Sequence, residues 1–155
     1  MKTPKTMTLT LRVLARLLSY PDDALREHLD ELRHALHAEA AIAPARLAEI
    51  DALIDSLGAQ SAIDAEADYV QLFDSGRRTS LHLFEHVHGD SRDRGPAMID
   101  LAQTFEAAGL YLAEGEMPDH LPVVLEYAST QPPREAQAFL AEMVHIFNVI
   151  FSALD

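Results

Sequence analysis

The chain contains no cysteine and no tryptophan, and its 6 glycines among 155 residues form no glycine-rich phosphate loop of either common spacing. The lack of cysteine excludes a disulfide framework, a thiolate nucleophile and a thiolate metal site, and it suits a reducing cytoplasm. Without a phosphate loop, nucleotide binding has no motif behind it. The sequence therefore predicts no bound cofactor.

Positive charge is also scarce. Lysine and arginine total 12 against 25 aspartates and glutamates, which gives a formal net charge of -13. A surface with this charge repels phosphate backbones, so we expect no nucleic acid as a partner. The same field speeds the approach of a basic or neutral polypeptide, although buried contacts supply most of the affinity.

Long apolar runs are missing as well. No uninterrupted apolar stretch approaches the roughly 18 residues that a membrane-spanning helix needs, so we predict no membrane insertion. Arg12 and Arg16 interrupt the apolar run between Leu9 and Leu18, and no small-residue cleavage site follows it. We predict a helix here rather than a signal peptide, and a cytoplasmic protein.

Helical periodicity dominates what is present. Apolar residues recur every three or four positions through most of the chain, and no segment alternates with the period of two that marks a strand. With 48% hydrophobic residues, the chain is long enough to bury one core. We predict one all-α domain over residues 1–155, a bundle of about eight helices of which one or two are short.

Capping residues place several helix ends. Gly58 is expected to close one helix in the left-handed conformation, and Ser61 to cap the next. Pro96 belongs in a first turn, which places a helix start near Asp93 or Arg94. Asp119 is expected to cap a helix that bears Leu121, Val124, Leu125 and Ala128.

The last predicted helix, residues 134–154, is apolar around most of its circumference. Such a helix needs neighbours on several sides. Three explanations stay open: it fills the centre of the bundle, it pairs with a second copy of the chain, or a following segment covers it. The second explanation predicts a homodimer through this helix.

Between Asp74 and Gly95 the helical period breaks down, and the segment is rich in residues that bind rather than react. His82 and His86 would share a helix face, with His88 and Asp90 just beyond, which suggests metal ligation. The HExxH pattern of zinc hydrolases is absent. Hydrogen-bonding or partner-facing histidines are the favoured interpretation.

Arg92 and Arg94 permit two interpretations. They can present guanidinium groups to carboxylates or phosphates near the positive end of the next helix. They can equally pair with Asp90, Asp93 or Asp100 on the surface.

Aromatic residues suggest a groove. Tyr69, Phe73, Phe84 and Tyr127 can each pack in the core, but the loop that carries Asp119 and His120 adds polar groups beside them. A carboxylate there can hold a cationic peptide side chain while the rings take its apolar face.

Three segments together resemble one family: residues 69–74 (YVQLFD), residues 80–95 (SLHLFEHVHGDSRDRG), and residues 118–122 (PDHLP) followed by 125–127 (LEY). This pattern is similar to the nitrate reductase assembly chaperones, also called the delta subunit or NarJ family. The resemblance implies an all-helical cytoplasmic chaperone without catalytic turnover. It implies binding of the cofactor-free catalytic (alpha) subunit of respiratory nitrate reductase, through that subunit's N-terminal peptide, until the molybdenum cofactor is inserted.

The resemblance also implies site residues. In the wider group of molybdoenzyme chaperones, the loop matching residues 118–120 contacts the partner's leader peptide, and residues 69 and 73 match the facing aromatic pair. The expected partner-binding residues are Tyr69, Phe73, Phe84, Glu85, His86, His88, Arg92, Arg94, Pro118, Asp119, His120 and Tyr127.

Two alternatives from other classes remain. One is a metal-dependent hydrolase that uses His82, His86 and Glu85. The other is a helical oligomerisation module built on the C-terminal helix.

Overall fold

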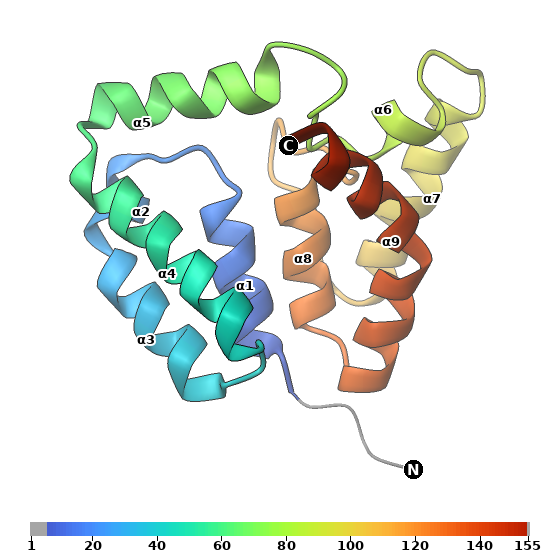
Figure 1. Ribbon diagram of the computed structural model, residues 1–155. Coiled ribbons are helices and arrows are strands. Elements are labelled where there is room, and N and C mark those ends of the chain that lie inside the picture. Colours follow the sequence, from blue (N-terminus) through green and yellow to red (C-terminus); the bar gives the residue numbers. More distant parts are fainter. Residues whose placement is uncertain (1–5, 155) are drawn as a thin grey trace.

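A computed structural model describes residues 6–154 and confirms the all-α class: these residues form nine α-helices and one π-helix, with no strand among them. The helices form two groups on either side of a central pair, α1 and α8 (Figure 1). The elements are α1 (Thr8–Leu17), α2 (Asp23–Glu27), α3 (Leu29–Glu39), α4 (Pro44–Ala59), α5 (Ala62–Tyr69), the π-helix η1 (Val70–Asp74), α6 (Phe84–Val87), α7 (Arg94–Ala107), α8 (Leu121–Ser129) and α9 (Pro133–Leu154).

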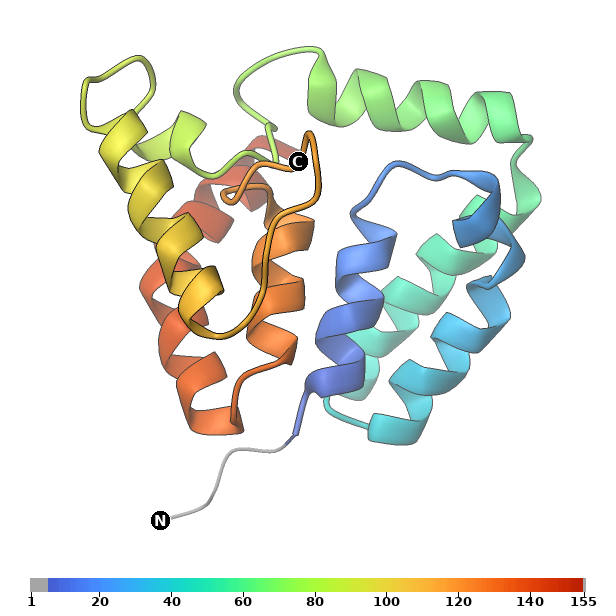
Figure 2. The same cartoon turned by 180° about the vertical axis from the view of Figure 1, so that it is seen from behind.

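Helix α1 joins the two groups because it is buried on opposite faces. Leu11 and Ala15 pack into one hydrophobic cluster with residues of α7, α8 and α9. Val13 and Leu17 pack into the other cluster with residues of α2, α3 and α4. Residues two apart point to nearly opposite sides of a helix, so one short helix serves both clusters. Seen from behind, α1 again lies between α8 and the α2–α4 group (Figure 2).

The start of α1 is capped from another helix. The carboxylate of Glu39, in the last turn of α3, accepts hydrogen bonds from the backbone N–H groups of Leu9 (3.1 Å) and Thr10 (2.8 Å). A carboxylate at this position satisfies free amides and complements the positive end of the helix dipole. The cap ties α1 to α3 at the end of the helix pair.

The helix count exceeds the predicted eight because one predicted helix is broken at His28. The prediction for Gly58 was wrong: α4 continues through it and ends at Ala59, and the next residue, Gln60, is extended. The chain runs on in extended conformation to Ser61, so no left-handed residue is needed there. Ser61 does cap α5, since its hydroxyl accepts from the Asp64 N–H at 3.1 Å.

Helix α5 and η1 form a weakly packed arm. In both views α5 crosses over the loop between α1 and α2 (Figures 1 and 2). Ala65 is the one buried residue of α5, and η1 has none. Ile63 is 77% exposed. A π-helix at the end of an α-helix is rare and often adjoins a functional site.

Helix α9 begins one residue before the predicted start and packs one face against α8 and α6. It does not fill the centre of the bundle, because Val144, Val149, Phe151 and Leu154 are exposed on its other face. Within residues 6–154 it is also the one helix long and apolar enough to cross a membrane, judged by length and composition alone.

Candidate functional site

Two of the segments singled out in the sequence meet in space. An isolated antiparallel bridge pairs His82 with His120. The Leu121 N–H donates to the Leu81 carbonyl (2.8 Å), and the Leu83 N–H donates to the Asp119 carbonyl (3.0 Å). Leu81 and Leu83 are buried on either side of His82, so alternation along this short extended run turns the His82 ring outward.

Asp119 lies beneath this bridge and has no solvent exposure. Its Oδ2 accepts a hydrogen bond from the Phe84 N–H at 3.1 Å, at the start of α6. The prediction that Asp119 caps α8 was therefore wrong: the residue before α8 is His120, and the carboxylate turns toward α6 instead. The expectation of an exposed acid in the 118–120 loop is corrected for the same reason.

The second carboxylate oxygen of Asp119 is unsatisfied. Oδ1 is buried and has no hydrogen-bond partner within the described residues. The His82 Nδ1 atom lies 3.7 Å away, which is an ion-pair distance rather than a hydrogen bond. Burial tends to raise the pKa of Asp119, but His82 and the Phe84 N–H outweigh it, and the pKa is lowered overall.

His82 and His120 stack face to face over this carboxylate, with ring centroids 4.7 Å apart and planes 21° from parallel. The Asp119 side chain raises the pKa of His82, burial opposes it, and Asp74 and Glu85 add to the rise. Burial and the neighbouring His82 lower the pKa of His120. The pKa values of the two adjacent imidazoles are therefore shifted in opposite directions, up for His82 and down for His120.

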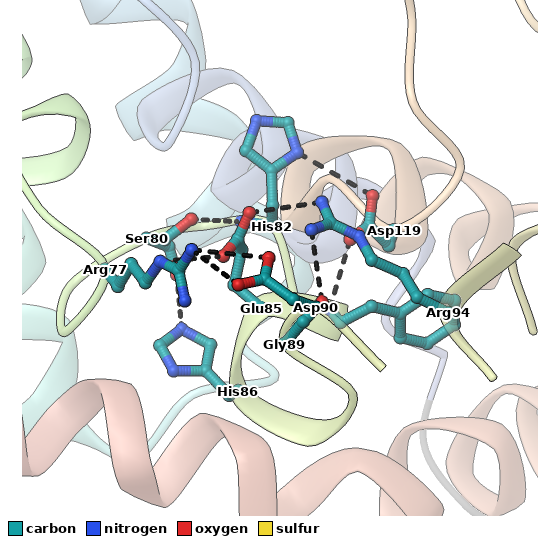
Figure 3. A network of polar contacts seen from close by, with 10 residues as sticks. Arg77, Ser80, His82, Glu85, His86, Gly89, Asp90, Arg94 and Asp119 are labelled. Atoms are coloured by element: carbon teal, nitrogen blue, oxygen red, sulfur yellow. Dashed lines mark hydrogen bonds and ion pairs between the residues drawn. The ribbon is translucent and has the colours of Figure 1, made fainter. Parts of the chain in front are cut away.

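Ion pairs fix the segment beside the histidines (Figure 3). Glu85 lies 3.1 Å from Arg94 and 3.8 Å from Arg77, and Arg77 lies 3.2 Å from Asp90. Arg94 thus pairs with Glu85 and not with the aspartates expected from the sequence. The ring of His86 is turned inward, with Nε2 2.8 Å from the Ser80 carbonyl.

A shallow surface groove opens next to His82. We call it the η1 groove; its volume is about 340 Å³, and it is lined by Phe73, Asp74, Ser75, Gly76, Arg77, Ser80, His82 and Glu85. Its lining combines one aromatic ring with two carboxylates and two basic side chains. A groove of this composition can seat an apolar side chain and a charged group side by side.

The aromatic wall of this groove is anchored to α1. Tyr69 and Phe73 are half-buried neighbours with ring centroids 5.0 Å apart, and Tyr20 meets Tyr69 edge to face at 5.8 Å. The Tyr69 hydroxyl donates to the Leu18 carbonyl at 2.8 Å. Burial, with a contribution from Asp74, raises the pKa of Tyr69 to about 12.

Other expected site residues lie elsewhere. Tyr127 is buried in the core between Phe105 and Phe139, away from His82. Pro118 is buried as well, whereas Arg92 is exposed. The Phe84 ring meets His88 edge to face at 5.2 Å on α6.

Several groove residues escaped the sequence analysis. His82 is not among the expected partner-binding residues, although a hydrogen-bonding or partner-facing role was the favoured interpretation of the histidines, and Asp74 and Arg77 were not expected as site residues. The alternation of buried Leu81 and Leu83 around His82 was the available signal for an outward-facing histidine. Among residues 6–154 no three histidine, aspartate or glutamate side chains are gathered to hold a metal ion, so the hydrolase alternative gains no support.

Comparison with known proteins adds a family. Residues 19–150 match the family model described as "Nitrate reductase delta subunit". The chain is 42% identical over 145 residues to the nitrate reductase molybdenum cofactor assembly chaperone NarJ of Escherichia coli (strain K12), a match that covers 94% of this chain and 61% of that protein. The probable assembly chaperone NarW of the same strain is 36% identical over 140 residues, covering 90% of this chain and 58% of NarW.

A more distant relative is the probable nitrate reductase molybdenum cofactor assembly chaperone NarJ of Bacillus subtilis (strain 168), which is 29% identical over 150 residues, 95% of this chain and 79% of that one. The fold is similar to the crystal structure of a protein described as a redox enzyme maturation protein from Archaeoglobus fulgidus. That likeness has a TM-score of 0.65 at 21% identity and covers 99% of this chain and 93% of the other. All the named relatives are chaperones or maturation proteins, in agreement with the expectation of a protein that is not an enzyme.

We predict that Asp119→Ala destabilises the fold, because the Phe84 N–H loses its acceptor. The free energy of unfolding should fall by about 2 kcal/mol, the usual cost of losing a hydrogen bond to a buried charged group. Urea denaturation followed by circular dichroism measures this change. Asp100→Ala, on the exposed side of α7, is the matched control and should cost under about 0.5 kcal/mol. Equal stability of the two variants would disprove the structural role of Asp119.

We also predict a pH dependence. The raised pKa of His82 means that its stabilisation is present below its unfolded value of 6.5 and is lost as pH rises through the folded value. The lowered pKa of Asp119 means that its stabilisation is present above 3.8 and is lost at more acidic pH. The stability difference between wild type and His82→Gln should therefore be greatest between about pH 4 and pH 6.5 and shrink above that range.

The difference should not exceed about 1 kcal/mol, because His82 is partly exposed. Urea unfolding of both proteins across this pH range measures it. His34→Gln, at an exposed position on α3, controls for general effects of removing an imidazole. A difference that grows toward alkaline pH would contradict the assigned pair.

Proposed function

The chain belongs to the nitrate reductase delta subunit family, and from that membership we propose that it is an assembly chaperone for the molybdenum-containing catalytic subunit of nitrate reductase. It holds the cofactor-free subunit, through the subunit's N-terminal segment, until the molybdenum cofactor is inserted. The chain spans 61% of the length of the Escherichia coli NarJ that it matches. The proposed action takes place in the cytoplasm.

The observation that carries this proposal is the η1 groove on an acidic chain. Its aromatic wall and its carboxylates lie within the segments that the sequence singled out, residues 69–74 and 80–95. A reversible peptide site needs an apolar anchor, a charged rim and no reactive group. The groove has these three properties, and the formal charge of -13 steers a basic segment toward it.

Within the groove the residues take different roles. Phe73 offers its ring to an apolar side chain of the peptide. Asp74, which is exposed, attracts a lysine or arginine, and the outward-facing His82 supplies a hydrogen-bonding edge. Asp119 acts from beneath as a positioning residue, because it is buried and fixes the segment that carries His82.

Two other expected binding residues, His120 and Arg94, adjoin this centre. His120 stacks on His82, and the ion pair of Glu85 with Arg94 holds the segment in place. Arg92 is exposed and His88 is half-buried, so both side chains can reach a partner.

We predict that Phe73→Ala lowers affinity for a synthetic N-terminal peptide of the catalytic subunit about tenfold. Removing a half-buried anchoring ring at an interface typically costs 1–2 kcal/mol or so. Isothermal titration calorimetry on the purified chain measures the affinity. Leu53→Ala, an exposed apolar position on α4, is the control and should bind as wild type. Tight binding by Phe73→Ala would remove the groove from the proposal.

We further propose that the exposed face of α9 pairs with a second copy of the chain. Val144, Phe151 and Leu154 are exposed. Together with Leu140 and Phe147, which are half-buried and also pack on the core, they follow the three-four spacing of a coiled-coil seam. Between residues 136 and 154 the sequence has one acidic residue, Glu142, and no lysine or arginine. Two chains of net charge -13 repel each other electrostatically. The repulsion is weakest at this face of α9, because it carries almost no charge.

Light scattering after size exclusion tests the pairing. Wild type should elute as a dimer at high concentration, and Phe151→Glu should elute as a monomer because it places charge in the seam. Ile63→Glu makes the same change at an exposed position on α5 and should not alter the mass. A wild-type chain that stays monomeric at every concentration would refute the dimer and leave the chaperone role intact.

A further inference from the structure

A second pocket lies on the side of α8 nearer α1. We call it the α8 pocket; its volume is about 390 Å³, and it is lined by Arg12, Arg16, Phe105, Leu110, Tyr111, Leu112, Glu116, Val123, Glu126, Tyr127, Ser129 and Thr130. Its walls come from α1, the end of α7, the loop between α7 and α8, and α8 itself. No part of the proposed function above uses this pocket.

The floor of the α8 pocket is aromatic and belongs to the core. Phe105 and Tyr127 are almost fully buried, and their ring centroids lie 4.7 Å apart. A surface pocket that reaches core rings offers an apolar contact without having to rearrange them. The volume is sufficient for one large apolar side chain.

The outer wall is a loop held in a defined shape. Gly109 and Gly115 have φ of 84° and 83°, a region that favours glycine, and they stand on either side of Leu110, Tyr111 and Leu112. The Ala113 N–H donates to a Glu116 side-chain oxygen at 2.7 Å, which closes the turn. Tyr111 is 77% exposed at the mouth of the pocket.

The rim carries charge of both signs. Glu116 and Glu126 form no ion pair within the described residues, and burial followed by the nearby Glu116 raises the pKa of Glu126. Arg12 and Arg16 line the α1 side, and the Arg12 Nε donates to the Ser129 hydroxyl at 3.3 Å. Arg16 and Arg12 act in the opposite direction and lower the pKa of Glu126. A cation from outside is therefore best accommodated near Glu116, where it relieves the repulsion between the two carboxylates.

The start of α8 connects this pocket to the η1 groove. His120 is the residue directly before α8, and Val123, which lines the α8 pocket, lies in the first turn of that helix. His120 stacks on His82, which lines the η1 groove. The histidine pair thus lies between the η1 groove and the α8 wall of the second pocket.

We propose that the peptide bound in the η1 groove continues across His120 and seats a second large apolar side chain in the α8 pocket, with an adjacent lysine or arginine at Glu116 and Glu126. This inference rests on the proposed function and extends it, because it assigns the peptide two anchors instead of one. The required segment is one with two apolar residues and a basic residue next to the second. The arginines of α1 take the backbone carbonyl groups of the same segment.

The test is calorimetric titration with the N-terminal peptide of the nitrate reductase catalytic subunit. The charge-reversal variant Glu116→Lys/Glu126→Lys should bind at least tenfold more weakly than wild type. Glu31→Lys/Glu142→Lys changes the net charge equally at exposed positions on α3 and α9. This control should retain affinity within about twofold, because rim charges outside an interface affect mainly the association rate.

A second variant tests the pocket itself. Val123→Trp fills the α8 pocket from its half-buried wall and should also lower affinity about tenfold. Replacing the second apolar residue of the peptide by alanine should weaken binding to wild type but not to Val123→Trp. Thermal unfolding of each variant separates lost binding from lost folding, and the double substitution keeps the test valid if Val123→Trp is less stable.

The outcomes separate the two proposals. If Phe73→Ala weakens binding while both pocket variants bind as wild type, the peptide ends at the η1 groove and the two-anchor inference is overturned. If wild type does not bind the peptide at all, the proposed function fails, and the inference with it. If the control variant weakens binding as much as Glu116→Lys/Glu126→Lys, the effect is general charge and the α8 pocket has no role.

Discussion

The geometry of the candidate site depends on one buried carboxylate. Asp119 holds the start of α6 through the Phe84 N–H, and its backbone carbonyl holds Leu83. These two bonds join segments that are more than thirty residues apart and turn His82 toward solvent. A buried carboxylate is costly unless donors surround it, and here one oxygen is left to the imidazole of His82 alone. This unfavourable burial occurs where two segments of the family motif, residues 80–95 and 118–122, meet.

That arrangement explains why the site suits recognition better than catalysis. Glu85 is engaged by Arg94, His86 faces a backbone carbonyl, and burial and the neighbouring His82 lower the pKa of His120. No side chain there combines a nucleophile with a base in hydrogen-bonding reach, which an attacking group requires. The groups that remain accessible in the groove are the Phe73 ring and the His82 imidazole, on a chain with a net negative charge. These are the elements of a reversible site for a basic, partly apolar peptide.

The sequence predicted the fold class, the helix starts at Ser61 and Arg94, and the family, because these depend on local signals: apolar period, capping residues and a long motif. It failed where a residue's role depends on distant partners. The residues around Asp119 in the sequence predict a helix cap. In the structure its carboxylate instead accepts a hydrogen bond from the Phe84 N–H, 35 residues away. Tyr127 is expected from the sequence to line the same groove as Tyr69 and Phe73, yet its ring packs between Phe105 and Phe139 and lines the α8 pocket instead. Such roles are set by tertiary packing, which local patterns do not encode.

The site combines a rigid floor with a loosely packed wall. The floor is the bridge between residues 81–83 and 119–121, backed by Leu81, Leu83 and the fully buried Val124. The wall is η1, which has no buried residue and continues from α5, which has one. Segments with few buried contacts open at lower free energy than the core does. A groove built in this way can fix the polar groups that give specificity while its aromatic wall adjusts to side chains of different size. This combination suits a chaperone that must bind its partner and later release it. The fixed polar groups position the peptide, and the loosely packed wall keeps the affinity moderate.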